Sequence, residues 1–306
     1  MLSLEGFIDL PEHKGRGAFD HAAVHTASGR CYVAHTANDA IDVIDLVARK
    51  YVGSIPGLPA VAGALVAESP DFVFTSNRGE DTVGIFSPTT EAHVQKVGVG
   101  AKPNGLAYDP AKQRLLAANI GDPAAPGSPT VSLVDVAACT RIADLPVAGA
   151  TRWTVYDSAA GVFHVNISNP PQIVVVDSAH AKIQRIVDIP HTGPHGLDID
   201  VARRRLYCAC DAGVFVELDA DTGGELAAEK IAGKPDVVFF NVALGRLYVA
   251  IGDPGVIEVF DVNPFRRREM VATEAGAHTL AFDASRNIVG AFLPETHRMA
   301  VYVDRK

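Results

Sequence analysis

Short segments in which hydrophobic and polar residues alternate recur along the whole chain, and nearly all of one set end in aspartate. A side-chain period of two over about five residues predicts a half-buried β-strand. The terminal residues of this set are Asp45, Ser87, Asp135, Asp177, Asp219, Asp261 and Asp304. Their spacings are 42, 48, 42, 42, 42 and 43 residues. The pattern therefore predicts seven structural repeats.

Each repeat has room for four short strands. Segments such as GLAYD, RLYVA and KIQRIVDI accompany the aspartate-ended strands, and turns rich in Gly, Pro, Asp and Asn separate them. This order predicts a four-stranded antiparallel meander in every repeat. The single long interval contains GDPAAPGSP at 121–129. We interpret this stretch as a loop insertion of about six residues, since the interval is 48 residues instead of 42.

Four strands in about 42 residues, repeated, are the signature of a β-propeller. The first strands begin near Asp20, Ala62, Asn104, Arg152, His195, Asp236 and His278. The seventh repeat has room for only three strands before the chain ends, whereas the alternating segment Leu4 to Leu10 precedes the first repeat. We therefore expect a single all-β domain over residues 1–306, a seven-bladed β-propeller of four-stranded antiparallel blades. The N-terminal strand would complete blade 7 and remove an open sheet edge.

The end of the second strand in several repeats carries a tetrapeptide that resembles the motif of the YVTN-repeat propellers. The corresponding stretches are Tyr32-Val33-Ala34-His35, Phe74-Thr75-Ser76-Asn77, Leu116-Ala117-Ala118-Asn119 and Tyr248-Val249-Ala250-Ile251, and no copy is perfect. The resemblance covers essentially the whole chain and implies the propeller fold. It implies less about function, because that group includes lactonase-like, lyase-like and non-catalytic members.

The composition is that of a globular protein and argues against several kinds of partner. Hydrophobic residues make up 48% and charged residues 21% of the chain, and no stretch approaches the roughly 20 apolar residues that span a membrane. The formal net charge of −9 disfavours nucleic acid and anionic lipid, which need clustered Lys and Arg. Glu5 and Asp9 lie where a signal peptide has its basic region. We therefore expect a cytoplasmic protein without nucleic-acid or membrane partners.

The first strands of a propeller line its central channel, so equivalent positions in them form a ring. The residues at the start of these strands are Asp20, Ala62, Asn104, Arg152, His195, Asp236 and His278. Six of these seven are polar or ionisable, whereas a plain channel lining is mostly Gly, Ala, Ser and Val. A neighbouring ring at the ends of the second strands has its polar members mostly in the first three blades: His35, Asn77 and Asn119. The two rings predict a ligand site at one mouth of the channel.

The channel ring contains the donor groups of a divalent metal site. Imidazole nitrogens with carboxylate oxygens suit Zn²⁺, Mn²⁺ or Fe²⁺, whereas an all-oxygen set suits Ca²⁺ or Mg²⁺. We expect His195, Asp236 and His278, from consecutive blades, to bind the metal. Asp20 would be a further ligand or a general base. The alternative is that these residues only hydrogen-bond within the fold.

Arg152 is the candidate for binding a substrate carboxylate, because its guanidinium pairs with oxyanions through two parallel hydrogen bonds. Asp20 or His35 would move the proton. The remaining substrate-binding candidates are Asn77, Asn104, Asn119 and Trp153. The structural alternatives are that Arg152 neutralises Asp20 and Asp236 across the channel and that Trp153 packs between blades.

Several familiar catalytic motifs are absent from the chain: GxSxG, HExxH, paired CxxC and a phosphate-binding Gly-rich loop. The segment Thr192-Gly193-Pro194-His195-Gly196 resembles Pro-His-Gly turns in propeller lyases and lactonase-like propellers, in which such a histidine serves the metal or acts as acid or base. The first hypothesis is therefore a metal-dependent hydrolase or lyase acting on a small oxygenated, anionic substrate, by lactone-like ester hydrolysis or elimination. The second is a non-catalytic scaffold that binds a protein or small ligand through rim loops such as 121–129.

Overall fold

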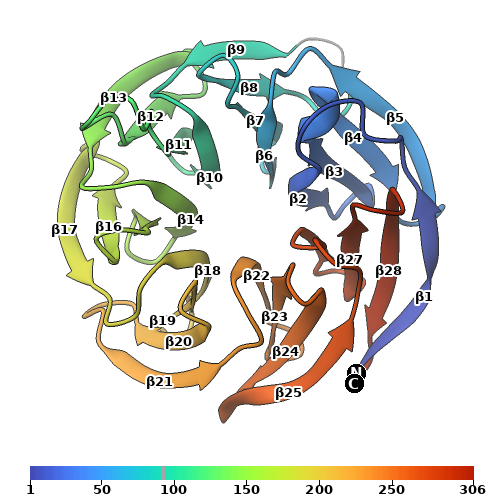
Figure 1. Ribbon diagram of the computed structural model, residues 1–306. Helices are drawn as coiled ribbons and strands as arrows, with labels where there is room; N and C mark the ends of the chain where they lie inside the picture. The colour runs from blue at the N-terminus through green and yellow to red at the C-terminus, as the bar shows by residue number, and fades with distance from the viewer. Residues whose placement is uncertain (91–93) are drawn as a thin grey trace.

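The computed structural model describes residues 1–90 and 94–306. Over these residues, 28 strands form seven four-stranded antiparallel sheets. Figure 1 shows the sheets arranged as blades around a common centre. In the described ranges the one helical element is a 3₁₀ turn, η1 (Thr36–Asn38), and none is a helix long and apolar enough to cross a membrane. The predicted seven-bladed β-propeller is confirmed.

The strands follow the predicted order in every blade. The first strands are β2 (Phe19–His25), β6 (Val61–Glu68), β10 (Pro103–Asp109), β14 (Thr151–Asp157), β18 (Pro194–Asp200), β22 (Pro235–Asn241) and β26 (Leu280–Asp283). The second strands are β3 (Arg30–His35), β7 (Asp71–Asn77), β11 (Arg114–Asn119), β15 (Val162–Ile167), β19 (Arg205–Cys210), β23 (Arg246–Ile251) and β27 (Ile288–Leu293). The third strands are β4 (Ala40–Asp45), β8 (Thr82–Phe86), β12 (Thr130–Asp135), β16 (Gln172–Asp177), β20 (Val214–Asp219), β24 (Val256–Val262) and β28 (Arg298–Asp304). The fourth strands are β5 (Lys50–Pro56), β9 (Gln95–Gly98), β13 (Thr140–Pro146), β17 (Lys182–Asp188), β21 (Glu225–Lys230), β25 (Phe265–Ala272) and, in blade 7, β1 (Leu2–Asp9).

The recurring aspartates are turn residues, which explains their period. The Asp177 carboxylate, at the end of β16, accepts hydrogen bonds from the backbone N–H groups of Ala179 (2.8 Å) and His180 (2.9 Å). The Asp135 carboxylate caps the following turn in the same way, through the N–H of Ala138 (2.9 Å). Because aspartate stabilises such turns with its own side chain, the third strand ends at this position in most blades. The predicted insertion, 121–129, lies between β11 and β12 as a loop.

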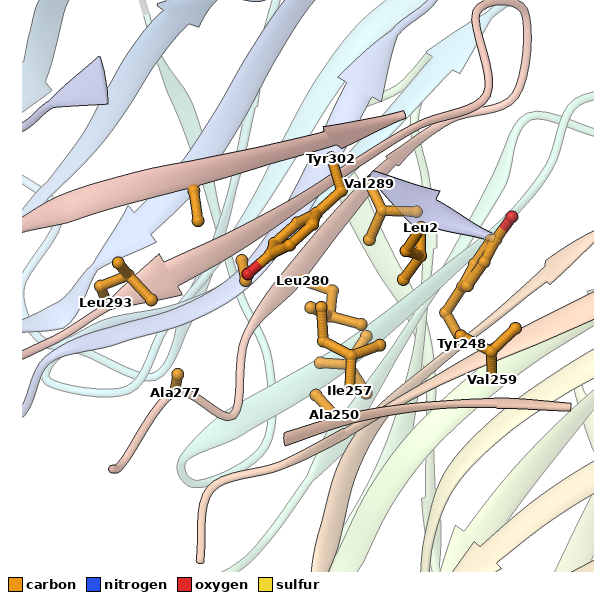
Figure 2. Close-up of a cluster of buried hydrophobic side chains, with 13 residues drawn as sticks. Leu2, Tyr248, Ala250, Ile257, Val259, Ala277, Leu280, Val289, Leu293 and Tyr302 are labelled. Atoms are coloured by element: carbon orange, nitrogen blue, oxygen red, sulfur yellow. The ribbon is translucent and has the colours of Figure 1, made fainter. Parts of the chain in front are cut away.

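The N-terminal strand closes the ring. β1 pairs antiparallel with β28, with Leu2 opposite Asp304, and Figure 1 shows the two ends of the chain side by side. The strand begins two residues before the predicted Leu4, because Leu2 is itself buried and its N–H donates to Glu269 at 2.9 Å. In Figure 2 the side chain of Leu2 lies in the hydrophobic cluster between blades 6 and 7, with Tyr248 and Tyr302.

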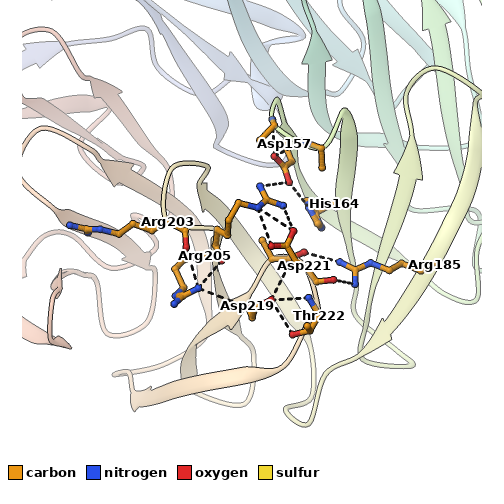
Figure 3. Close-up of polar contacts among 12 residues, drawn as sticks. Asp157, His164, Arg185, Arg203, Arg205, Asp219, Asp221 and Thr222 are labelled. Atoms are coloured by element: carbon orange, nitrogen blue, oxygen red, sulfur yellow. Dashed lines mark hydrogen bonds and ion pairs between the residues drawn. The ribbon is translucent and has the colours of Figure 1, made fainter.

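Buried ion pairs join neighbouring blades on the side away from the predicted site. Arg204 of blade 5 pairs with the buried Asp157 of blade 4 at 2.7 Å and with Asp221 at 2.7 Å (Figure 3). Burial alone would raise the pKa of Asp157, but hydrogen bonds from His164 and Arg204 outweigh it and lower the pKa to about 2. Asp157 therefore remains a carboxylate at neutral pH and holds the two blades together.

Candidate functional site

The predicted ring lies at one mouth of the channel, and irregular strand pairing positions its side chains. In blades 1 to 6 the register between the first and second strands shifts at the ring position. In blade 1, for example, regular pairing is interrupted between Phe19 and Ala22, on either side of Asp20. A bulge turns the side chain away from the ordinary alternation and is common next to functional sites. In blade 7 the first strand begins only at Leu280, so His278 precedes it.

Glycines that follow the ring residues allow the first strands to approach closely. A Cβ atom at Gly105 would lie 2.5 Å from the carbonyl oxygen of Arg152, and one at Gly196 would lie 2.5 Å from that of Asp236. Real Cβ atoms essentially never come so near another backbone, so any side chain there would push the blades apart. The glycines therefore bring the ring residues of neighbouring blades together.

The structure brings His195, Asp236 and His278 together in one cluster. The Nδ1 atom of His195 lies 2.9 Å from Asp211 Oδ1, and its Nε2 atom lies 3.2 Å from Asp236 Oδ1. The other oxygen of Asp236 is 3.7 Å from His278 Nε2. His278 Nδ1 donates to the carbonyl oxygen of Gly276 at 2.7 Å. One carboxylate therefore lies between two imidazoles.

The carboxylates hold His195 in its protonated form. Burial would lower the pKa of His195, but the hydrogen bonds to Asp211 and Asp236 outweigh it and raise the pKa to about 9. Burial would likewise raise the pKa of Asp236, whereas its hydrogen bond to His195 and the positive charge of His195 hold that pKa well below its usual range. The pair is therefore an imidazolium and a carboxylate at neutral pH.

Asp20 and Asn104 belong to a second cluster, which forms around Arg78. Asp20 Oδ2 lies 3.2 Å from Arg78 Nη1, and Asp20 Oδ1 lies 3.3 Å from Nε2 of the buried His21. Arg78 also donates to the side-chain oxygen of Asn104. The cation that neutralises Asp20 is therefore Arg78 and not Arg152.

Arg152 is the one ring cation whose charge is not matched by a direct contact. It has no hydrogen-bond or ion-pair partner within residues 1–90 and 94–306, and its Nε atom is buried without a partner. The positive charge of Arg152 acts on two nearby groups. It opposes the rise in the pKa of His195, and it contributes to the lowering of the pKa of Asp211. A guanidinium left unpaired among such groups is able to bind an anion from solution.

Trp153 lies across the channel beneath the ring. Its ring centroid is 4.2 Å from that of His21 in blade 1 and 6.4 Å from that of Phe239 in blade 6. Trp153 is only partly buried and packs against the cluster between blades 6 and 7 and against a cluster formed mainly by blade 5. Packing between blades, the structural alternative for Trp153, is therefore observed. Its role in binding a substrate stays a prediction.

Three of the candidate residues lie inside their own blades and not with the channel cluster. His35 is fully buried and hydrogen-bonds through Nδ1 to Asp42 (2.7 Å) and through Nε2 to His13 (2.8 Å). Asn119 donates to Thr130 and Ser132, at 2.9 Å each, and Asn77 bonds in the same way to the next strand. These second-strand residues connect to the third strand and contribute to blade stability.

Sequence reasoning missed two residues that complete the mouth, Arg78 and Asp211. Each is the first residue after the second strand, directly after Asn77 and Cys210. The second ring, which was predicted at the last residues of the second strands, should therefore be placed one residue later in the sequence. The alternation of strand residues contained the signal: the strand's last side chain points into the blade, so the following residue is the one that reaches the channel.

The donor groups at the mouth do not fit the predicted metal centre as they are arranged. In the described part of the chain, no group of three or more His, Cys, Asp or Glu side chains is placed to hold a metal ion. Both ring nitrogens of His195 already contact carboxylates, so neither is free to take a metal ion in this arrangement. The metal stays a hypothesis drawn from residue types, and no chemistry is derived from it below.

Comparison with known proteins supports the fold and no family. No protein-family description matches the chain, and no curated protein matches it. Among solved structures, the Kuenenia stuttgartiensis hydrazine synthase aligns with a TM-score of 0.82 at 12% identity, over 96% of each chain. A chain of the mitotic checkpoint complex aligns with a TM-score of 0.83 at 10% identity, over 99% of this chain and 92% of that one.

The third solved structure is the Cps50 (Swd1) β-propeller domain of Myceliophteria thermophila, with a TM-score of 0.81, 11% identity and complete coverage of both chains. The likeness establishes the fold. At such identities, function does not follow from it, because propellers serve many unrelated purposes. Membership of the YVTN-repeat group and the cytoplasmic location stay predictions.

Proposed function

We propose that the mouth of the channel binds a small oxyanion-bearing molecule and carries out acid–base chemistry on it. The observation that carries the proposal is the unpaired Arg152, whose charge acts on His195, together with the two histidines that share Asp236. A carboxylate of the substrate would accept two parallel hydrogen bonds from Arg152. Its reacting group would then lie among His195, His278 and Asp236.

The two histidines have different roles. His195, protonated between two carboxylates, is the general acid. His278 is half-exposed, and its Nδ1–H donates to a backbone carbonyl, so Nε2 carries the lone pair that can accept a proton. A general acid and a general base on neighbouring side chains can serve one reaction at one pH.

Hydrolysis of a lactone-like ester can be written with these groups alone. Water attacks the carbonyl carbon while His278 Nε2 accepts a proton from that water. The ring C–O bond then breaks, and His195 donates its proton to the leaving oxygen, which gives a hydroxy acid. The two histidines exchange protons with water before the next turnover. An elimination would use the same base and the same acid.

The test compares two substrates that differ only in a carboxylate: γ-butyrolactone and the same five-membered lactone bearing a ring carboxylate. Hydrolysis is followed by acid release. We expect kcat/KM to favour the anionic lactone by at least about tenfold, and Arg152→Gln to remove this preference, since one charge-assisted bidentate contact contributes about 1.5–3 kcal/mol. Arg141→Gln, at an exposed position on the outer strand β13, is the control and should keep it. Absence of hydrolysis, or an unchanged preference in Arg152→Gln, would refute the proposal.

A second candidate function is protein binding through the insertion loop. Residues 123–127 are exposed, and the loop is held in shape by hydrogen bonds between Asp122 and Ser128 (2.7 and 3.0 Å). It joins a second to a third strand and therefore lies at the same end of the propeller as the mouth. One structural neighbour is part of a mitotic checkpoint complex, which is an example of a propeller in a protein assembly. Deleting 122–127 should abolish capture of a defined partner and leave lactone hydrolysis intact.

A further inference from the structure

The far halves of the first strands form a second, chemically different site. A cavity of about 490 Å³ lies on the other side of Trp153 from the polar ring. Its walls are largely apolar, and Val66, Val155, Ile199 and Phe239 are only partly covered there. The cavity begins at His21 and Trp153, whereas the ring residues precede them in their strands. This site is therefore separate from the proposed function.

The carboxyl group of Asp198 lies within the apolar wall, whereas that of Glu68 lies at the opening. Asp198 Oδ1 accepts the N–H of Ile199 at 2.8 Å, and Oδ2 accepts the N–H of Phe240 at 2.6 Å. A carboxylate has about four acceptor positions, so two remain for another donor. Asp198 is partly exposed and lines the cavity. The backbone bonds fix its orientation and leave it without a side-chain partner in the described structure.

The cavity favours a positively charged occupant. No Lys or Arg is among its lining residues in the described structure, and the titratable groups that line it are His21, Glu68, Tyr108, Tyr156 and Asp198. Burial lowers the pKa of His21, so this imidazole is neutral at neutral pH. Glu68 is exposed at the opening. The lining therefore offers negative charge and no competing cation.

Aromatic rings add a second attraction for a cation. Trp153 forms the inner end of the cavity, and Phe239 meets it at an interplanar angle of 89°. The face of an indole ring attracts an ammonium group within about 6 Å, and more strongly where water is excluded. The apolar walls would cover the rest of such a molecule, at about 25 cal/mol for each Å² removed from water.

We propose that this cavity binds a small organic ammonium compound, with its charged group at Asp198 and Trp153 and its apolar body against Val155 and Ile199. The cavity opens at the exposed Glu68 and Pro110, on the face opposite the polar mouth. A carboxylate compound would be repelled there, and a neutral compound would gain no charge pairing. The two ends of the channel thus select ligands of opposite charge.

Trp153 is the only tryptophan in the chain, so its fluorescence reports binding directly. The probes are 2-phenylethylamine and the uncharged 2-phenylethanol, which have nearly the same size. We expect a saturable change in emission with the amine, and at least about tenfold weaker binding of the alcohol, since a charged hydrogen bond contributes about 1.5–3 kcal/mol. This comparison uses the unaltered protein and depends on no variant.

Two matched variants locate the charge. Asp198→Asn should weaken amine binding by at least about tenfold and leave alcohol binding unchanged. Asp236→Asn removes a channel carboxylate on the other side of Trp153 and should leave amine binding unchanged. Equal affinity for amine and alcohol, loss of binding in Asp236→Asn alone, or no saturable change with the amine would each overturn the proposal.

The pH dependence gives a further check. Burial raises the pKa of Asp198 to about 7, although the N–H groups of Phe240 and Ile199 act in the opposite direction. The free carboxyl is therefore half protonated near neutral pH and must lose its proton to pair with an ammonium. Amine affinity should rise about tenfold from pH 6 to pH 8 in the unaltered protein and stay flat in Asp198→Asn. A flat profile in the unaltered protein would contradict the role of Asp198.

Discussion

Single charged residues hold neighbouring blades together, and Asp304 is one of them. Its buried carboxylate pairs with Arg246 and accepts hydrogen bonds from Tyr248 (2.8 Å) and from the N-terminal ammonium (3.0 Å). These contacts join blade 6, blade 7 and the closing strand. A change at Asp304 therefore affects both the contact between these two blades and the closure of the ring.

The variant Asp304→Asn should lower the free energy of unfolding by about 3 kcal/mol, because it leaves Arg246 buried without its counter-charge. Urea denaturation measures the change. Asp261→Asn, at the same repeat position in blade 6, is the control. Its partners Arg266 and Arg268 are exposed, so its loss should be below about 1 kcal/mol. Equal losses in the free energy of unfolding of the two variants would show that burial of the Asp304–Arg246 pair adds nothing to its contribution.

Acid should loosen the contact between blades 4 and 5 in a defined pH range. The pKa of Asp157 is about 2 in the fold, below its ordinary value of 3.8. A carboxyl group whose pKa is lowered by folding stabilises the fold above the unfolded pKa, and this stabilisation disappears as pH falls through the folded pKa. Asp157 should therefore contribute about 2 kcal/mol at pH 7 and lose it between about pH 4 and pH 2.

The matching variant is Arg204→Gln, which removes the cation and keeps a residue with a side chain at this left-handed position (φ 57°). It should be less stable than the unaltered protein at pH 7, and the two denaturation curves should converge as pH approaches 2. A constant difference at all pH values would mean that Arg204 acts by packing and not by charge.

At the residue scale, sequence predicted the channel ring but not every partner in it. His195, Asp236 and His278 were found because the repeat places equivalent residues in register. Arg78 and Asp211 were missed because the second ring was taken at the last residue of the second strands, whereas the residue that follows the strand is the one that reaches the channel. Asp198 was missed because its neighbours read as an ordinary strand.

At the scale of strands, the closing strand should contribute much more to thermal stability than the insertion loop. Deleting residues 1–9 leaves blade 7 with three strands and exposes the edge of β28. Deleting 122–127 only restores the usual 42-residue spacing, since loops of this kind tolerate shortening. We expect the first deletion to lower the melting temperature by about 10 °C or more, and the second by no more than about 3 °C. Similar shifts for both would contradict ring closure by β1.

Strand order, blade number and the closing strand followed from sequence because the repeat is regular and its turns are marked by aspartate. The exact strand ends did not follow from the repeat. The start of β1 at Leu2 depends on burial against blade 6, and the late start of β26 depends on local pairing with β27. Contacts between distant repeats leave no trace in the period of a single strand.

At the scale of the whole molecule, the propeller gives one channel two chemically different ends. All first strands run in the same direction, so their initial residues gather at one mouth and their later residues at the other. The first set is polar and includes an unpaired arginine, whereas the cavity at the other end has largely apolar walls with the carboxyl group of Asp198 among them. Trp153 separates the two.

Metal content tests whether the mouth of the channel binds a divalent ion. His195 uses both ring nitrogens in contacts with carboxylates, so we expect purified protein to contain no stoichiometric divalent metal and to melt at the same temperature with and without a chelator. Elemental analysis and thermal melts measure both. One bound metal per chain, released by chelator with a lower melting temperature, would restore the metal-dependent hypothesis.

A crystal structure with a small dicarboxylate such as succinate tests the central claim most directly. The account predicts one carboxylate of the ligand in bidentate contact with Arg152, with the rest of the molecule beside His195 and His278. Arg152→Gln crystals treated in the same way should show no ligand at the mouth. A ligand bound elsewhere on the propeller, or an empty mouth at saturating succinate, would contradict the account.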